Sequence, residues 1–341
     1  MLPWGSLGTQ VWVPGSVLLI LVLLYGLHAS LQWWCLPWNL QHCSTDLTGK
    51  TVVVTGANSD YPTLPLPPSG IGKAVSQELA RRGARVILAC RSRERGQQAL
   101  AEIQAASGSD HLLLGEVDLS SLASIRSFAQ WLLQKEPEIH LLVNNAGITG
   151  FPHKTLTPEG LDVTFATNYV GPFLLTNLLR GALNRAGAAR VVNVSSFRQS
   201  YGYIDEGHLT GAGGPLAFHQ NYDCSKLLLV SFTTELARRL RGTGVTVNSV
   251  EPGIVYTNIM KNYSWLFRFL FWLLSLFWKN PKQGAVPVLY LSLAQELDGV
   301  SGKYFSRSCV ITLPAQPAQD PHLAQRLWNA SVRLTNLDKM D

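Results

Sequence analysis

The first 45 residues contain no Asp, Glu, Lys or Arg. Their apolar core at positions 11–31 is long enough to cross a bilayer, which takes about 20 residues. A cleaved signal peptide normally begins with basic side chains, and none precedes this core. We therefore predict an uncleaved membrane anchor helix within residues 1–46, with secretion after signal cleavage as the alternative. Trp33, Trp34 and Trp38 follow the core, where an interfacial aromatic belt would lie.

The chain as a whole lacks several other signatures. Its five cysteines form no CxxC pair, so neither a disulfide framework nor a metal site is indicated. The net charge is +6, but no basic stripe is interleaved with aromatic residues, so no nucleic-acid partner is predicted. Only 15% of the 341 residues are charged and 46% are hydrophobic, which allows a large core. One α/β domain over residues 47–341 fits this length better than two domains.

Apolar runs alternate with helical patterns along this domain. Strands are expected at 51–55, 85–91, 111–116, 139–143, 190–194 and 245–250. Helices are expected at 93–106, 161–183 and 222–241, and another should be capped by Ser120. Near-continuous apolar strands that alternate with helices predict a doubly wound, Rossmann-like parallel sheet covered on both faces.

The first strand ends at Gly56, and a helical pattern begins after Gly70 and Gly72. Glycines at such a turn let the backbone approach a pyrophosphate, which the helix N-terminus attracts. The motif is interrupted by residues 60–69, a segment of ten residues with four prolines. Proline continues neither strand nor helix, so this insert must loop out where the phosphates would sit.

Tyr222 and Lys226 stand at i and i+4 of a predicted helix, on one face. Tyrosine has a reference pKa of about 10, and a nearby cation favours its phenolate, which makes it usable in acid–base chemistry. The pair follows a strand that ends in Ser195 and Ser196, whose hydroxyl groups can hydrogen-bond a carbonyl oxygen. A tyrosine and a lysine at this spacing are common on solvated helices. The interpretation therefore depends on the serines and the glycine loop that accompany them.

A second apolar stretch occupies positions 265–278, inside a segment at 263–279. At about 14 residues it is too short to span a bilayer. Aromatic residues and leucines surround its whole circumference, which is unusual for a core helix of this size. We favour a helix at the mouth of an apolar substrate pocket that rests on the membrane, and a core helix is the alternative.

From Leu47 to Leu334 the chain resembles the short-chain dehydrogenase/reductase family. The resemblance rests on the glycine loop, on Asn144-Asn145-Ala146-Gly147, on Tyr222-x-x-x-Lys226 and on Pro252-Gly253. It implies that Tyr222 is the proton donor and acceptor, that Lys226 lowers its pKa and holds the nicotinamide ribose, that Ser196 orients the substrate, and that Asn168 supports a water leading to Lys226. Ser195 is the alternative to Ser196.

The resemblance also implies the cofactor contacts. They comprise Thr55, Gly56, Asn58, Ser59, Gly70, Ile71, Gly72, Arg91, Asp118, Asn145, Ala146, Gly147, Tyr222, Lys226, Pro252, Gly253 and Thr257. NAD sites usually end the second strand with an acidic residue, whereas here Arg91 follows Cys90, with Arg93 nearby. Because arginine suits a 2′-phosphate, NADP(H) is expected rather than NAD.

The microsomal retinol dehydrogenase branch is the most similar part of the family. The segments 88–91, 171–176 and 301–305 carry that likeness, which implies retinol/retinal or related lipid chemistry on endoplasmic reticulum membranes. Two features depart from it: the insert, and Glu251, which stands where the branch usually has histidine.

The expected function is an NADP(H)-preferring oxidoreductase that interconverts lipophilic alcohols and aldehydes or ketones. Its partners would be a lipophilic small molecule and a membrane. A homodimer is a further candidate assembly. The rival is a non-catalytic membrane scaffold of the same fold that has lost cofactor binding through the insert. A soluble lipid carrier is a weaker rival, because it does not explain the presence of Ser196, Tyr222 and Lys226 together.

Overall fold

The computed structural model describes residues 19–20, 22–27, 38–58, 70–150, 155–204, 218–255, 257, 259 and 278–339. Ser59, the insert at 60–69 and most of the second apolar stretch lie outside these ranges, as does much of the predicted anchor. Residues 19–20 and 22–27 are helical. Within the described ranges no helix combines the length and the apolar character needed to cross a bilayer. The anchor therefore remains a prediction.

Eight strands form one sheet in the order β3-β2-β1-β4-β5-β6-β7-β8. Strands β1 to β7 run parallel, and β8 is antiparallel to β7. Their bounds are β1 Thr51–Thr55, β2 Arg85–Cys90, β3 Leu112–Glu116, β4 Leu141–Asn144, β5 Ala189–Val194, β6 Val245–Val250, β7 Tyr304–Phe305 and β8 Ile311–Thr312. The doubly wound α/β fold expected from the sequence is confirmed.

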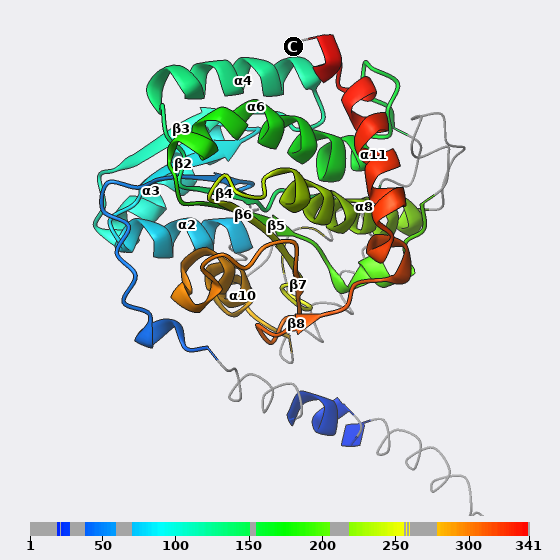
Figure 1. Cartoon of the computed structure of the whole chain (residues 1–341). Helices are drawn as coiled ribbons and strands as arrows, with labels where there is room; N and C mark the ends of the chain where they lie inside the picture. The colour runs from blue at the N-terminus through cyan, green and yellow to red at the C-terminus, as the bar shows by residue number, and fades with distance from the viewer. Residues whose placement is uncertain are drawn as a thin grey trace, which may run out of the picture.

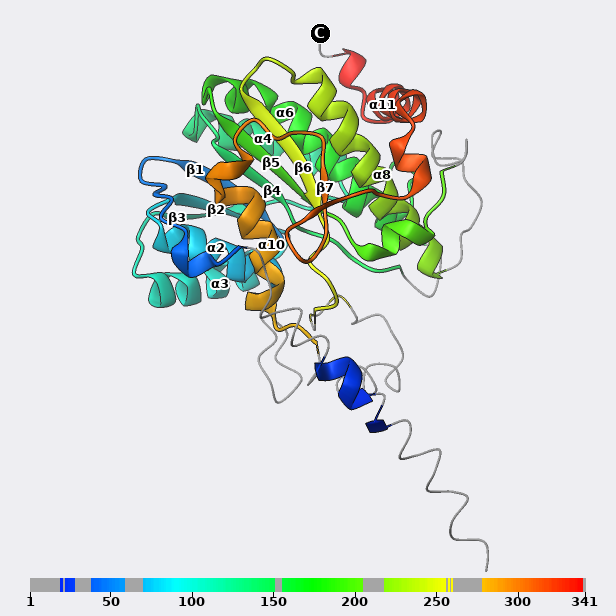
Figure 2. The ribbon, with the colours of Figure 1, turned by 60° about the horizontal axis from the view of Figure 1, so that its bottom comes forward.

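Helices cover both faces of the sheet (Figure 1), as the near-continuous apolar strands require. One face carries α2 Ile71–Arg81, α3 Arg93–Ser107 and α10 Pro281–Leu293, which come forward in Figure 2. The other carries α4 Leu122–Lys135, α6 Gly171–Arg185, α8 Phe218–Arg239 and α11 Pro321–Leu334. Side chains of β1 alternate between the two layers, since Val52 and Val54 join the first and Val53 the second.

Three helix starts differ in detail from the sequence prediction. The helix expected at 222–241 is α8, which begins earlier, at Phe218. The expected helix at 161–183 begins with α5 Val163–Phe165 after the cap Asp162, widens into a π-helical turn η2 at Ala166–Val170, and continues as α6. Ser121, not Ser120, caps α4, because its hydroxyl accepts a hydrogen bond from the Ser124 N–H at 3.3 Å. The Ser120 hydroxyl instead donates to Asp118, so the cap lies one residue later than expected.

The strand order reverses direction between β1 and β4, since β2 and β3 lie on one side and β5 to β8 on the other. In an open parallel sheet the crevice beside the carboxyl ends of the strands at such a point is where ligands bind. The residues that follow β1, β4, β5 and β6 include the motifs singled out from the sequence. The fold therefore brings these motifs to one edge of the sheet.

Candidate active site

A cleft crosses the carboxyl ends of the strands, and most of the predicted site residues form its wall. Those on the wall are Gly56, Asn58, Gly70, Ile71, Arg91, Asp118, Asn145, Ala146, Gly147, Ser195, Tyr222, Lys226, Pro252 and Thr257. Segments separated by up to 200 residues in the sequence thus meet in one continuous site. Thr55, Gly72, Asn168, Ser196 and Gly253 lie outside the wall, and Ser59 lies outside the described residues.

The two parts of the interrupted glycine motif are in contact. A Cβ atom at Gly72 would lie 2.6 Å from the carbonyl oxygen of Gly56 and 2.4 Å from Nδ2 of Asn145. Gly56 has φ +70°, and a Cβ atom there would lie 2.8 Å from Cα of Ala146. Only glycine fits either position, so Gly72 acts by close packing behind the cleft wall.

Thr55 fastens the turn after β1 to the turn after β4. Its hydroxyl oxygen accepts hydrogen bonds from the N–H groups of Asn145 and Ala146, each at 3.0 Å. The Asn145 side chain donates in return to the carbonyl oxygen of Thr55 at 2.8 Å. Thr55 is buried, so its contribution to the site is to hold these two turns together.

The N-terminus of α2 opens onto the cleft beside Gly56 and Asn58. Gly70 is its N-cap residue and has no side chain that could cap it. The first intrahelical bond runs from the N–H of Ala74 to the carbonyl oxygen of Gly70, so the preceding N–H groups have no intrahelical acceptor. Such a helix end, with backbone close by, suits a pyrophosphate.

Two arginines stand at the far end of the cleft. Arg91 directly follows β2, and Arg95 lies in the first turn of α3. Arg93, which the sequence placed nearby, is exposed and does not line the cleft. Ser92 caps α3 by accepting from the Arg95 N–H at 3.4 Å, and side chains of a helix tilt toward its N-terminus. The cap at Ser92 is the sequence signal that could have identified Arg95.

Asp118 lines the same end of the cleft as these arginines, and its carboxylate also stabilises the loop that follows β3. Its Oδ1 atom accepts from the backbone N–H of Ser120 at 2.9 Å and from the Ser120 hydroxyl at 2.7 Å. Asp118 therefore acts as a turn residue in this loop, and it also lines the cleft, so the expected cofactor contact remains a prediction.

Lys226 and Tyr222 lie together on α8 at the opposite end. The ammonium group of Lys226 is 5.8 Å from the centre of the Tyr222 ring and donates to the carbonyl oxygen of Val194 at 2.8 Å. Burial of Lys226 lowers its pKa to about 8, because desolvation disfavours the charged form. The lysine head group is thus fixed by β5 and positioned beside the phenol.

Asn168 lies in the π-helical turn and is linked by hydrogen bonds to the part of α8 that carries Tyr222 and Lys226. Its side chain accepts from the Ile148 N–H and donates to the Ile148 carbonyl oxygen, each at 2.9 Å. It also donates to the Ser225 hydroxyl at 3.0 Å, and that hydroxyl donates to the Tyr222 carbonyl oxygen at 2.7 Å. Asn168 therefore connects the turn after β4 to the first part of α8, and π-helical turns are frequent at functional sites.

The two adjacent serines after β5 have different surroundings. The Ser195 hydroxyl donates to the carbonyl oxygen of Lys226 at 3.0 Å, which ties the end of β5 to α8. The Ser196 hydroxyl accepts from the N–H of Arg198 at 3.2 Å and caps the short helix η3 at Phe197–Tyr201. Ser195 lines the cleft and Ser196 does not. The role of Ser196 toward a substrate remains a prediction.

Glu251, the departure from the retinol dehydrogenase pattern, does not line the cleft. Its carboxylate accepts from the Tyr304 hydroxyl at 3.1 Å and joins β6 to β7. Gly253 has φ +86°, and a Cβ atom there would lie 3.2 Å from Cδ of Arg307. These contacts shape the turn whose Pro252 lines the cleft.

Several wall residues carry no motif and were missed from the sequence. Ile148, Thr149, Thr167, Val194 and Ile259 are among them. The Thr149 hydroxyl donates to the Ile259 carbonyl oxygen at 2.8 Å, which joins the loop after β4 to the segment after Pro252. A single threonine in a loop gives no sequence signal for such a contact.

The cleft suits a dinucleotide along its whole length. Basic side chains occupy one end, a glycine turn and a helix N-terminus the middle, and a tyrosine–lysine pair the other end. The close approach of Gly56 and Gly72 supplies the narrow backbone cradle that a pyrophosphate needs. A doubly wound sheet with this cleft defines a nicotinamide-dependent oxidoreductase.

Comparisons with known proteins agree. Residues 50–265 match the short chain dehydrogenase family. Retinol dehydrogenase 11 from Homo sapiens is 41% identical over 296 residues, covering 86% of this chain and 88% of that protein. Retinol dehydrogenase 12 from Bos taurus is 43% identical over 298 residues, covering 86% and 90%. The crystal structure of an uncharacterized protein from Mycobacterium paratuberculosis has a TM-score of 0.68 at 30% identity, covering 88% and 97%. The chain belongs to the short-chain dehydrogenase/reductase family.

Proposed function

We propose that this protein interconverts lipophilic alcohols and the corresponding aldehydes or ketones, with retinol and retinal as model substrates. The observation that carries the proposal is the placement of Tyr222 and Lys226 in one cleft with the Asn145–Gly147 turn and the glycine cradle. Relatives of about 40% identity are named retinol dehydrogenases, which favours this substrate class over polar alcohols.

In carbonyl reduction, Tyr222 gives its hydroxyl proton to the substrate oxygen and is left as a phenolate. The Lys226 ammonium, held by Val194, stabilises that phenolate because opposite charges attract more strongly in a buried site. Asn168 keeps α8 in register through Ser225. The nicotinamide, when bound, supplies or accepts the hydride. In alcohol oxidation the same proton returns to Tyr222.

The cofactor we propose is NADP(H). Arg91 and Arg95 both line the end of the cleft where an adenosine ribose would lie, and a guanidinium binds phosphate through two parallel hydrogen bonds. Asp118 at this end already accepts two hydrogen bonds from Ser120. The positive side chains therefore favour a 2′-phosphate.

We also propose membrane association, on the endoplasmic reticulum, through the apolar N-terminal residues. Leu19, Leu23, Leu24 and Leu27 lie in helical residues and each is more than half exposed. A helix that is apolar all round is typically buried in a protein core or in a membrane, and the exposure of these leucines favours the membrane. The second apolar stretch at 265–278 would be a further contact.

Replacing Tyr222 with phenylalanine tests the proposal. Tyr222→Phe removes the acid–base hydroxyl and should lower retinal reduction by about 10²–10⁴-fold. The NADPH-induced thermal shift should persist, and Tyr201→Phe, which changes a solvent-exposed tyrosine, should leave turnover intact. Retained reduction by Tyr222→Phe would remove Tyr222 from the mechanism.

The insert at 60–69 favours a second candidate, a membrane scaffold that keeps the fold without binding a cofactor. The insert enters the phosphate turn directly after Asn58 and Ser59. A protein that gives no thermal shift with either NADPH or NADH, while remaining folded, would support this scaffold.

A further inference from the structure

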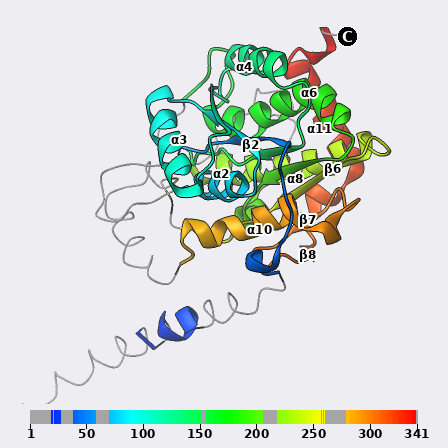
Figure 3. The ribbon, with the colours of Figure 1, turned by 90° about the vertical axis from the view of Figure 1, so that its left-hand side faces the viewer.

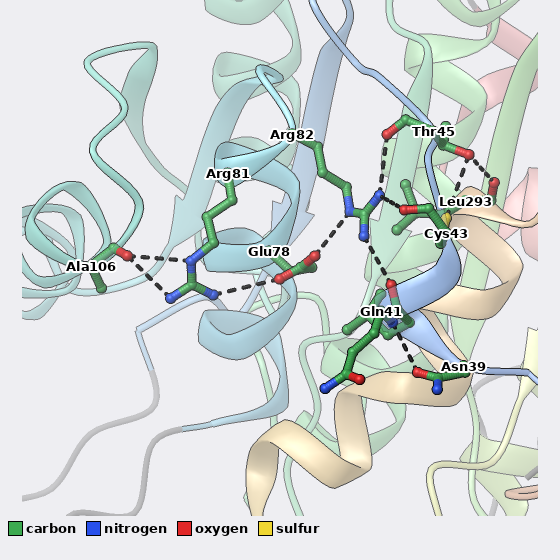
Figure 4. Close-up of polar contacts among 10 residues, drawn as sticks. Asn39, Gln41, Cys43, Thr45, Glu78, Arg81, Arg82, Ala106 and Leu293 are labelled. Atoms are coloured by element: carbon green, nitrogen blue, oxygen red, sulfur yellow. Dashed lines mark hydrogen bonds and ion pairs between the residues drawn. The ribbon is translucent and has the colours of Figure 1, made fainter.

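Residues 38–45, which we call the strap, are fastened to the catalytic domain by Arg82 at the end of α2. Its guanidinium donates to the carbonyl oxygens of Leu40 at 3.2 Å, Cys43 at 2.7 Å and Thr45 at 3.3 Å. Glu78 accepts from its Nε atom at 2.9 Å (Figure 4). The Thr45 hydroxyl donates to the Leu293 carbonyl oxygen at 2.8 Å, which ties the strap to α10 as well.

Aromatic contacts extend from the strap to the edge of the sheet. Trp38 packs on Tyr290 of α10 at 5.3 Å between ring centres, and Tyr290 packs on Phe305 of β7 at 6.1 Å. Phe305 pairs with Ile311 of β8. In Figures 1 and 3 the strap helix η1 (Leu40–His42), α10 and β8 lie on the same side of the body. The strap therefore begins close to the outer strand β8.

That outer strand and the residues on either side of it expose large apolar side chains to solvent. Val310, Ile311 and Leu313 are 52%, 51% and 79% exposed. Proteins normally protect an edge strand with charged residues, proline or a covering element, and exposed apolar groups mark interaction sites. β8 ends the sheet of the described residues, so these exposed apolar side chains form a candidate contact surface.

We infer that β8 rests on the surface of the bilayer and that the strap, through Arg82, holds it there. The inference rests on the membrane association proposed above. Ten residues separate Leu27 of the apolar N-terminal helix from Trp38. A chain of this length spans at most about 40 Å, so an anchored helix keeps the strap and β8 near the membrane.

A lipid surface fits this edge better than a second copy of the chain. A stable dimer buries about 1,200–2,000 Å² in total, and β8 has only two residues in the ladder. Apolar side chains inserted among lipid head groups need no such complementary surface.

The test uses the full chain in phosphatidylcholine vesicles, with Cys35→Ser and Cys43→Ser as background. A nitroxide is attached through Leu313→Cys, and in a matched protein through Gln130→Cys on α4, on the side of the body opposite β8 in Figure 1. The label at 313 should be relaxed by oxygen and shielded from a water-soluble nickel complex, and the label at 130 should show the reverse. Identical behaviour of the two labels would overturn the inference.

Arg82→Ala should reduce the oxygen relaxation at 313, whereas Arg81→Ala should not. Arg81 is the matched control because it contacts Glu78 and the Ala106 carbonyl oxygen but not the strap (Figure 4). No effect of Arg82→Ala would show that the strap does not hold the edge.

Spin–spin broadening between labels at 313 would instead identify a contact between two copies and overturn the lipid assignment. Since the readout needs no turnover, it stays decisive if the proposed catalysis fails, and failure to recover the protein with vesicles would overturn the membrane proposal itself.

Discussion

A Cβ atom at Gly72 would lie 2.6 Å from the carbonyl oxygen of Gly56, so the residues on the two sides of the insert are in direct contact. Eleven residues from Ser59 to Ser69 separate Asn58 from Gly70, yet both line one cleft. The cradle for a pyrophosphate is therefore assembled from its two separated parts. We therefore expect any effect of the insert to fall on access to that cradle, since Gly56 and Gly72 pack together in its presence.

Gly72→Ala should disturb this contact. The added methyl group meets backbone and the Asn145 amide, so we expect a loss of about 1–3 kcal/mol in the free energy of unfolding and at least about tenfold weaker NADPH binding. Chemical denaturation and fluorescence titration measure the two effects. Gly181→Ala is the control, since a Cβ atom there meets only the flexible Arg185 side chain at 3.3 Å. Equal behaviour of the two variants would contradict the close packing.

Arg91→Ala should lower the preference for NADPH over NADH by about tenfold, because a hydrogen bond to a charged group contributes about 1.5–3 kcal/mol. Arg95→Ala should have a similar effect, since both side chains line this end of the cleft. Arg93→Ala, an exposed neighbour outside the cleft, should change nothing. The ratio of kcat/KM for the two cofactors is the measurement, and an unchanged ratio in Arg91→Ala would remove Arg91 from the 2′-phosphate site.

Carbonyl reduction should fall as the pH rises through about 8. Burial lowers the pKa of Lys226 to about 8, so the ammonium loses its proton over this range and no longer stabilises the Tyr222 phenolate. The sign follows because the lysine is charged below its pKa and neutral above it. Lys226→Arg keeps the charge and should move the fall to higher pH. A wild-type profile that is flat through this range would contradict the role given to the ammonium.

The full chain should remain in the membrane pellet after a carbonate wash. A form that lacks residues 1–37 keeps the strap and should show weaker binding that detergent removes, because β8 and the second apolar stretch remain. Flotation with vesicles measures this residual binding. A truncated protein that stays entirely in the soluble fraction, folded and monomeric, would contradict any contact beyond the anchor.

Six of the eight strands could be predicted because each is a short apolar run between turn residues, whereas β7 and β8 have two residues each and are too short to show such a pattern. Val245–Val250 forms β6 as expected, and the strand expected from Arg85 is β2. The site could be predicted for the same reason: its motifs directly follow strand ends, and a parallel sheet brings those ends to one edge. Tyr222 and Lys226 then follow from the helical spacing of four residues.

The remaining features depend on contacts that leave no pattern in the sequence. Arg82 binds three backbone carbonyl groups, and any residue type supplies a carbonyl. The π-helical turn at Ala166–Val170 contains Asn168, whose hydrogen-bond partners lie in two other segments. Tertiary packing decides each of these.

The insert at 60–69 is the feature of the sequence that argues against full enzymatic activity. Lengthening a flexible loop adds only fractions of a kcal/mol in closure entropy, so the fold tolerates residues 60–69. Phosphate binding is more sensitive, because a stiff proline-rich segment enters next to Asn58 and brings Asp60, which repels a pyrophosphate. We expect the insert to weaken NADPH binding without abolishing it.

The most direct test is to titrate the full chain with NADPH beside a version that lacks residues 60–69, and to follow cofactor fluorescence. The account predicts saturable binding by both proteins, with the shortened one binding more tightly and reducing retinal faster. Equal dissociation constants would show that the insert does not obstruct the cradle. Failure of both folded proteins to bind NADPH or NADH would contradict the assignment of this cleft as a nicotinamide site.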